Sequence, residues 1–173
     1  MKYEGVCIAV KDVKASTKFY QDLFGLEIYQ DNGINISFGG LSLQQDFDWL
    51  LGISKDRIKS EPHNMELYFE EVNFDDFIDK LNVRNDIRYL DSGEPEKNKA
   101  INDRKFTYLG NGINEAPWGQ RSIKFYDPDG HIIEVGENLK MVIKRFLDSG
   151  LTLEETSKRM DVSIQDLKTL LNS

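Results

Sequence analysis

The stretch FYDPDGHIIEVGE, residues 125–137, holds two β-prone runs separated by a tight turn. The turn is DPDG at 127–130, where proline fixes φ and glycine accepts a positive φ. After it, Ile133 and Val135 flank Glu134. This alternation predicts a strand with one apolar face and one face that carries a carboxylate. Either water or a binding cavity can receive that carboxylate, and the rest of the chain must decide between them.

Length and composition exclude several classes of protein. The chain has 173 residues, with 39% hydrophobic and 30% charged side chains, which is typical of a soluble globular domain with a substantial core. A net charge of −8 argues against a general affinity for nucleic acid or anionic membranes. No apolar run approaches the roughly 20 residues of a membrane span, and MKYEGVCIAV at the start does not resemble a signal peptide. With Cys7 as the single cysteine, we expect a cytoplasmic protein without an internal disulfide.

The first half of the chain predicts the order βαβββ. EGVCIAV at 4–10 is a strand pattern, and VKASTKFYQDLF at 13–24 is a helix pattern. Asp12 is a suitable cap before that helix, and Gly25 a suitable end after it. Three further strands are predicted from LEIYQ, INISF and LSLQQDF, with turns at Asn32-Gly33 and Gly39-Gly40.

The same order begins again near residue 64, which indicates an internal repeat. NMELYFEEV predicts a strand, NFDDFIDKLNV a helix and IRYL a short strand. A polar stretch at 91–117 follows, and QRSIKFY and HIIEVGE then close the second module as a hairpin around DPDG. The sequence therefore predicts an α+β protein with two βαβββ modules, at 1–58 and 62–137.

Strand alternation places two sets of side chains on opposite faces of the sheets. The apolar set, expected to face the helices, is Val6, Ile8, Leu41, Leu43, Leu67, Phe69, Ile133 and Val135. The other set, expected on the concave side, is Gly5, Cys7, Gln44, Glu66, Tyr68, Ile132 and Glu134. If the modules pair to close a trough, Gln44, Glu66 and Glu134 converge in it. Such oxygen-bearing side chains could bind a divalent cation or act as general acids and bases, or they could be solvated side chains on a wet sheet face.

The repeated units resemble the vicinal-oxygen-chelate superfamily, which includes glyoxalase I, bleomycin-resistance proteins, fosfomycin-resistance proteins and extradiol dioxygenases. The resemblance rests on VKDVKASTKFYQDLFGLEI at 10–28 and WGQRSIKFYDPDGHIIEVGE at 118–137, and it covers roughly residues 3–137. It implies a glyoxalase-like domain at 1–137, with the two modules forming a curved sheet barrel. Residues 138–173 would then be a C-terminal helical tail.

The resemblance also implies where a metal would bind. Metal-using members place one ligand on the first and last strands of each module, which corresponds here to Gly5, Gln44, Glu66 and Glu134. Gly5 offers no side chain. Three oxygen ligands without an imidazole suit Mg²⁺ or Mn²⁺ better than Zn²⁺ or Ni²⁺. In such a site Glu66 or Glu134 would be the catalytic base.

Four further residues are candidates for contact with a substrate. Tyr68 and Trp118 could form an aromatic wall, although Trp118 could also anchor its loop. Arg121 could clamp a substrate carboxylate or pair with Glu66, and a surface position is the alternative. Cys7 faces the expected cavity but has no neighbour in sequence that would activate its thiol, so we interpret it as a small filler.

Two functions remain open. The first is a glyoxalase-like enzyme, related to lactoylglutathione lyase, that acts on a small oxygenated molecule with metal-assisted lyase or isomerase chemistry. The alternative is a metal-free binding or resistance protein that sequesters a small ligand. The pair Glu66 and Glu134 favours the enzyme, and the missing side chain at Gly5 favours the binding protein.

The tail predicts three helices. LKMVIKRFLDSG is a helix pattern, Thr152 and Glu155 fit a capping box, and SIQD at 163–166 fits a last helix start. The spacing resembles a helix-turn-helix, but the last helix offers only Lys168 for phosphate contact, so we do not expect nucleic-acid binding. Seven apolar residues need a covering surface: Met141, Val142, Phe146, Leu147, Leu167, Leu170 and Leu171. We therefore expect the tail to pack on the barrel or on a second subunit, in a homodimer.

Overall fold

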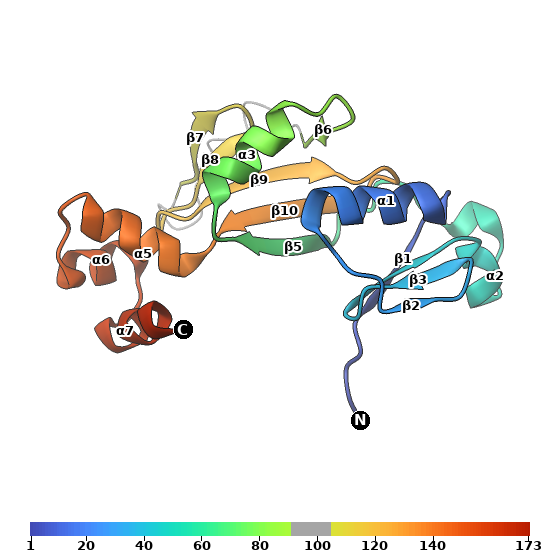
Figure 1. Cartoon of the computed structure of the whole chain (residues 1–173), viewed down its shortest axis with the longest axis horizontal. Helices are drawn as coiled ribbons and strands as arrows, with labels where there is room; N and C mark the ends of the chain where they lie inside the picture. The colour runs from blue at the N-terminus through green and yellow to red at the C-terminus, as the bar shows by residue number, and fades with distance from the viewer. Residues whose placement is uncertain (91–104) are drawn as a thin grey trace. The chain divides into compact units, whose positions relative to one another are not determined.

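The computed structural model describes residues 1–90 and 105–173, which divide into two compact units (Figure 1). The first unit comprises Met1–Met65 and Tyr126–Ile132, and the second Glu66–Phe125 and Ile133–Ser173. Each unit contains one open sheet, of four and six strands respectively. The predicted α+β class with two modules is confirmed. The division into a domain at 1–137 and a tail at 138–173 stays a prediction.

The first unit has the predicted βαβββ order. Its elements are β1 (Val6–Ala9), α1 (Val13–Phe24), β2 (Gln30–Asp31), β3 (Asn35–Ser37), β4 (Leu41–Gln44), α2 (Phe47–Leu51) and a 3₁₀ turn at Lys55–Arg57. The strands lie in the order β1-β4-β3-β2, with β1 and β4 parallel and Val6 opposite Leu41. The run LSLQQDF was predicted as one strand, but the strand ends at Gln44 and α2 begins at Phe47.

Helix α1 and the DPDG turn are joined by side-chain hydrogen bonds. Tyr20 Oη donates to Asp127 at 2.8 Å, and Ser16 Oγ donates to Asp129 at 2.9 Å. His131 contributes a backbone N–H and its Nδ1 to the same Asp127 carboxylate, each at 2.8 Å. Residues four apart lie on one helical face, so Ser16 and Tyr20 reach the two acids of the turn together. The polar residues of the helix pattern and the acids of the turn pattern are therefore hydrogen-bond partners in the folded chain.

The second unit repeats the first and adds a hairpin. Its strands and its first helix are β5 (Glu66–Glu71), α3 (Phe74–Asn82), β6 (Arg88–Tyr89), β7 (Thr107–Gly110), β8 (Ile113–Glu115), β9 (Arg121–Tyr126) and β10 (Ile132–Glu137). The sheet order is β5-β10-β9-β8-β7, with β6 also paired to β9. The path β5-β10-β9-β6 therefore matches β1-β4-β3-β2, and β7–β8 is the addition.

The added hairpin was missed in the sequence. Residues 91–117 were predicted as an intervening polar stretch, of which 91–104 lie outside the described residues. In the described part, β7 and β8 pair around Asn111-Gly112, with φ angles of 50° and 79°. Two successive positive φ values are the signature of a tight hairpin turn, and Asn-Gly is its preferred sequence.

Five of the eight apolar residues that alternation assigned to the helix-facing side are buried, and Val6, Leu41 and Phe69 are partly buried. Ile8, Leu43, Leu67, Ile133 and Val135 are each at most 8% exposed. In the second unit, α3 covers this face and buries its own apolar stripe of Phe74, Phe77, Ile78 and Leu81. None of the helices in the two described ranges has the length and apolar character needed to cross a membrane.

The tail forms three helices with a core of their own: α5 (Leu139–Asp148), α6 (Leu153–Met160) and α7 (Ile164–Asn172). The Thr152–Glu155 capping box is present, and Ser163 caps α7. The core consists of Val142, Ile143, Phe146, Met160 and Leu167.

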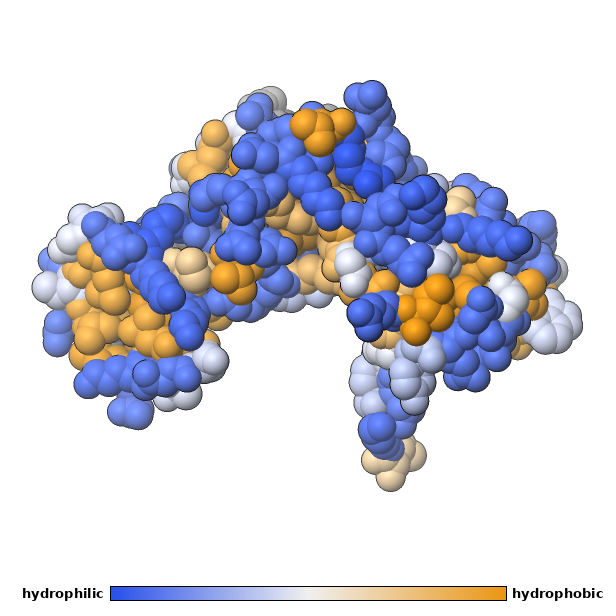
Figure 2. All heavy atoms as spheres, in the orientation of Figure 1, coloured by the Kyte–Doolittle hydropathy of each residue, from blue (hydrophilic) through white to orange (hydrophobic). Residues whose placement is uncertain are grey.

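The three helices bury Val142 and Leu167 in this core, and Trp118 packs against the same core while Gly119 lies against the ring of Phe146. Leu147, Leu170 and other rim residues stay partly buried. Figure 2 accordingly shows apolar side chains at the surface of the C-terminal helices. The homodimer stays a prediction.

Candidate carboxylate site

Glu134 forms an ion pair with Lys124 across the hairpin that gives the chain its most recognisable sequence. The bond from Asp127 N to His131 O, 3.0 Å long, sets a register in which Lys124 of β9 lies opposite Glu134 of β10. Lys124 Nζ is 2.7 Å from Glu134 Oε1, and the two side chains are 28% and 16% exposed. Sequence reasoning missed Lys124, although it stands three residues before Asp127 and Glu134 stands three residues after His131, the two residues that the backbone bond joins.

Glu66 of β5 completes a carboxyl pair with Glu134. Burial, a hydrogen bond with Glu134 and repulsion from its charge raise the pKa of Glu66. Burial alone would raise the pKa of Glu134 too, but the hydrogen bond and positive charge of Lys124 outweigh it and lower that pKa. The two pKa values therefore move apart, and the groups titrate as a pair.

Tyr68 lies two residues after Glu66 and on the same face of β5. Its Oη accepts a hydrogen bond from Gln120 Nε2 at 2.9 Å and donates to Glu70 at 3.3 Å. Burial raises the pKa of the phenol, and the bond from Gln120 opposes that rise. The ring is 48% exposed, so it is available to a ligand. Gln120 was not among the predicted site residues.

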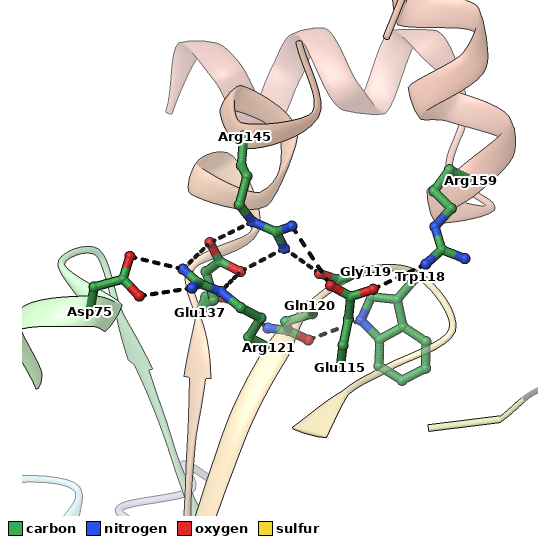
Figure 3. A network of polar contacts seen from close by, with 9 residues as sticks. All are labelled: Asp75, Glu115, Trp118, Gly119, Gln120, Arg121, Glu137, Arg145 and Arg159. Atoms are coloured by element: carbon green, nitrogen blue, oxygen red, sulfur yellow. Dashed lines mark hydrogen bonds and ion pairs between the residues drawn. The ribbon is translucent and has the colours of Figure 1, made fainter. Parts of the chain in front are cut away.

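Arg121 does not pair with Glu66, which corrects one prediction. Its guanidinium lies 5.0 Å from the ring centre of Phe74 on α3, and it donates to Asp75 at 2.8 Å and to both oxygens of Glu137 at 3.0 Å (Figure 3). Arg121 thus faces the helix side of the sheet, away from Glu134. Its odd-numbered position in β9, shared with core residues, could have indicated this.

Two other predicted contacts have local roles in the structure. Trp118 donates its indole N–H to Gln120 Oε1 at 3.0 Å and packs against the tail core, so it anchors its loop. Cys7 is half-buried in β1, and burial raises the pKa of its thiol, which opposes activation. Direct contact of Trp118 or Cys7 with a substrate stays a prediction.

Gly5 cannot be replaced by a metal ligand without moving the backbone. Its φ is +134°, and a Cβ atom there would lie 2.1 Å from the carbonyl oxygen of Gly40. The strands approach so closely because Val6 N bonds to that same oxygen at 2.9 Å. The absence of a side chain at this position therefore has a steric cause.

Strand register also changes the counterpart of Glu134 in the first unit. The terminal hydrogen bonds of the two parallel ladders run in opposite directions: Val10 N, after β1, donates to Gln44 O at 3.0 Å, whereas Glu71 O, at the end of β5, accepts from Asn138 N at 2.9 Å. The first ladder sets Ala9 opposite Gln44, and the second bond sets Glu71 opposite Glu137. With the helix caps Asp12 and Asn73 in register, Glu134 then corresponds to Ser42 rather than to Gln44. The side chain of Gln44 is 2% exposed and engaged by Asn35 and the Gln45 carbonyl.

These donors do not fit a resident divalent cation. In the second unit, Glu66 and Glu134 share their environment with the Lys124 ammonium, which occupies one carboxylate. The corresponding first-unit positions are a glycine and the hydroxyl of Ser42. Among the described residues, no three His, Cys, Asp or Glu side chains are grouped closely enough to hold a metal. Gln44 belongs to the other unit, and its convergence with the carboxylates stays a prediction.

Solved structures with the same fold include several glyoxalase-related proteins. A protein of unknown function from Agrobacterium tumefaciens str. C58 is 26% identical, with a TM-score of 0.56 over 79% of this chain and 94% of that chain. A glyoxalase-related enzyme from Fulvimarina pelagi is 20% identical, with a TM-score of 0.53 over 80% and 88%. A glyoxalase/bleomycin resistance protein/dioxygenase family enzyme from Burkholderia phytofirmans PsJN is 16% identical, with a TM-score of 0.53 over 79% and 98%.

The sequence itself also matches a protein family. No curated protein matches it significantly. The profile of the glyoxalase-like domain matches residues 3–101 and 96–140, and α6 and α7 lie beyond the matched region. With both βαβββ modules inside the match, the chain belongs to the glyoxalase-like domain family of the vicinal-oxygen-chelate superfamily.

Proposed function

We propose that the protein catalyses proton transfer on a small oxygenated molecule, one with a carbonyl group beside a hydroxyl-bearing carbon. The observation that carries this proposal is the carboxyl pair of Glu66 and Glu134, whose pKa values are moved in opposite directions. Neighbouring acids whose environments separate their pKa values are suited to the roles of general acid and general base.

The two carboxyl groups have different roles in this mechanism. Glu134, which ionises more readily, removes the proton from the hydroxyl-bearing carbon. The C–H electron pair forms the double bond of an enediol, and the carbonyl oxygen takes a proton from Glu66. Glu134 then returns its proton to the neighbouring carbon, and Glu66 recovers a proton from the other hydroxyl, which leaves an isomer of the starting compound.

Lys124 and Tyr68 support these steps. The ammonium group of Lys124 keeps Glu134 ionised and stabilises negative charge that develops on the substrate oxygen. Tyr68, half exposed on the same sheet face, offers a ring and a hydroxyl for the body of the substrate. Divalent metals are common in the superfamily, but the donors here do not fit one, and no step of this mechanism passes through a metal.

Hydrogen–deuterium exchange tests the proposal without knowledge of the product. The purified protein is incubated in D₂O with a panel of small hydroxyaldehydes, hydroxyketones and keto acids, and loss of the carbon-bound proton signal is followed by NMR. We expect exchange with at least one compound, and a loss of roughly 100-fold or more in Glu134→Gln, as removal of a general base typically gives. No exchange above buffer with any compound would contradict the proposal.

Metal-free binding without catalysis is the second candidate. Gly5 and Ser42 favour it, because the first module offers no strong donor at either of its two ligand positions. A saturable complex with a panel compound, measured by calorimetry in the presence of a chelator, together with no deuterium exchange, would support this candidate over the enzyme.

A further inference from the structure

The C-terminal helices hold the loop at residues 116–120 in place. Arg145 of α5 donates from Nη2 to the carbonyl oxygen of Gly119 at 2.5 Å (Figure 3). The ring of Phe146 lies so close that a Cβ atom on Gly119 would be 2.1 Å from its Cζ. Gly119 also has a φ of +88°, so both the conformation and the position of this loop suit a glycine pressed against α5.

From this loop, one amide reaches the face that carries the carboxyl pair. Trp118 packs against the tail core and donates its indole N–H to Gln120 Oε1 at 3.0 Å. Gln120 Nε2 then donates to Tyr68 Oη and to the carbonyl oxygen of Glu137, both at 2.9 Å. Because an indole nitrogen can only donate, the bond to Trp118 fixes which end of the amide points to Tyr68.

Strand β10 leaves room for this contact at one glycine. A Cβ atom on Gly136 would lie 2.7 Å from Tyr68 Oη and 3.0 Å from Gln120 Nε2. The phenol and the amide therefore meet directly above a position without a side chain. The hydrogen bond and the space for it are independent observations that both locate Tyr68.

We propose that the tail sets the position of Tyr68 in the carboxylate site, through Trp118 and the positioning residue Gln120. All of these contacts lie within the second unit, so the position of Tyr68 is argued from them alone. Only the effect on a substrate rests on the proposed function. Two of the three tail helices lie beyond the region that the family profile matches. The tail would thus be an added element that adjusts which small molecules the common fold accepts.

The titration of Tyr68 tests this coupling in the full chain. Tyrosine ring carbons are labelled with ¹³C, and the Tyr68 signal is identified by its loss in Tyr68→Phe. A donor to the phenol favours the phenolate, so Gln120→Leu should raise the pKa of Tyr68. Trp118→Phe, which removes the indole donor and leaves Gln120 in place, should move that pKa in the same direction and by less.

The control and a second readout separate this inference from general destabilisation. Arg159→Gln removes a tail contact to Glu115, 3.1 Å long, that is not on the path to Tyr68, and it should leave the titration unchanged. Deuterium exchange should fall by about 3- to 10-fold in Trp118→Phe, which corresponds to one lost hydrogen bond.

Two outcomes would overturn the coupling. In the first, Gln120→Leu leaves the pKa of Tyr68 unchanged. In the second, Gln120→Leu shifts that pKa but Trp118→Phe does not. A shifted titration in both variants, with no exchange in the wild type, would retain the coupling and refute the proposed function. If the wild type catalyses deuterium exchange, and Trp118→Phe changes neither that exchange nor the Tyr68 titration, the proposed function is retained and the coupling is refuted.

Discussion

Replacing Glu137 with glutamine should destabilise the second unit by about 2–4 kcal/mol. The Glu137 side chain is 3% exposed and accepts hydrogen bonds from Arg121 and Arg145, which are 19% and 32% exposed. Breaking a fully buried ion pair costs about 3–5 kcal/mol because the remaining charge is left without a partner. The two guanidinium groups keep some contact with water, so we expect a value at or below the lower part of that range.

The pH dependence of this effect follows from the pKa of Glu137. Burial would raise that pKa, but the hydrogen bonds from Arg121 and Arg145 outweigh it and lower the pKa. A lowered pKa in the folded state gives stability that is present above the ordinary glutamate value of about 4.3 and is lost as pH falls through the folded value. The difference between wild type and Glu137→Gln should therefore be full at pH 7 and shrink below about pH 4.

Differential scanning calorimetry measures this prediction. At about 2–4 °C per kcal/mol for a chain of this size, the transition of the second unit should fall by roughly 5–15 °C. Asp75→Asn is the matched control, because Asp75 pairs with the same Arg121 but is 79% exposed, and exposed pairs contribute about 0–1 kcal/mol. Equal melting temperatures for Glu137→Gln and Asp75→Asn would refute the reasoning from burial.

Three further predictions concern other sites. Lys124→Met removes the charge that lowers the pKa of Glu134, so the acidic limb of the pH–rate profile for deuterium exchange should move to higher pH; an unmoved limb would show that Glu134 is not the base. Gly5→Ala should cost more than about 2 kcal/mol in urea unfolding, whereas Gly25→Ala, at a positive φ with no atom nearby, should cost about 1; equal costs would contradict the steric explanation. Thr156→Val should stabilise the tail by about 1 kcal/mol in thermal melts, because Thr156 Oγ1 is buried without a hydrogen-bond partner among the described residues, and a lower melting temperature would indicate a bound water there.

The fold could be predicted because its two modules carry strong local signals. Asp12 caps α1 and accepts from two backbone amides, as a capping residue does, and Thr152 and Glu155 form the expected box at α6. The hydrogen bonds from Tyr20 and Ser16 to the DPDG turn add a long-range constraint that leaves a recognisable sequence pattern. Local propensity and tertiary contact therefore pointed to the same architecture.

The site was harder to predict because its residues depend on partners across strands. Glu66 and Glu134 share a face by alternation. Their pKa values are separated by Lys124, which is found opposite Glu134 only by counting outward from the hydrogen-bonded pair Asp127 and His131. Gln44 was matched to Glu134 by alternation alone, which repeats every two residues and cannot detect a shift of two. Only the hydrogen-bond register could identify Ser42.

Strand β9 offers one edge to two partners placed end to end. The bond from Leu90 N to Lys124 O, 3.1 Å long, attaches β6 near one end, while Ile113 and Glu115 of β8 pair with Ile123 and Arg121. In the first unit, where Ser42 corresponds to Glu134, the counterparts of Lys124 and Ile123 are Ser37 and Ile36, and both pair with β2. Strand β8 therefore occupies a backbone position on β9 that the end of β2 occupies on β3, while the strand order of the repeated path is kept. The two copies of the module can therefore share one strand order although one of them is longer by a whole hairpin.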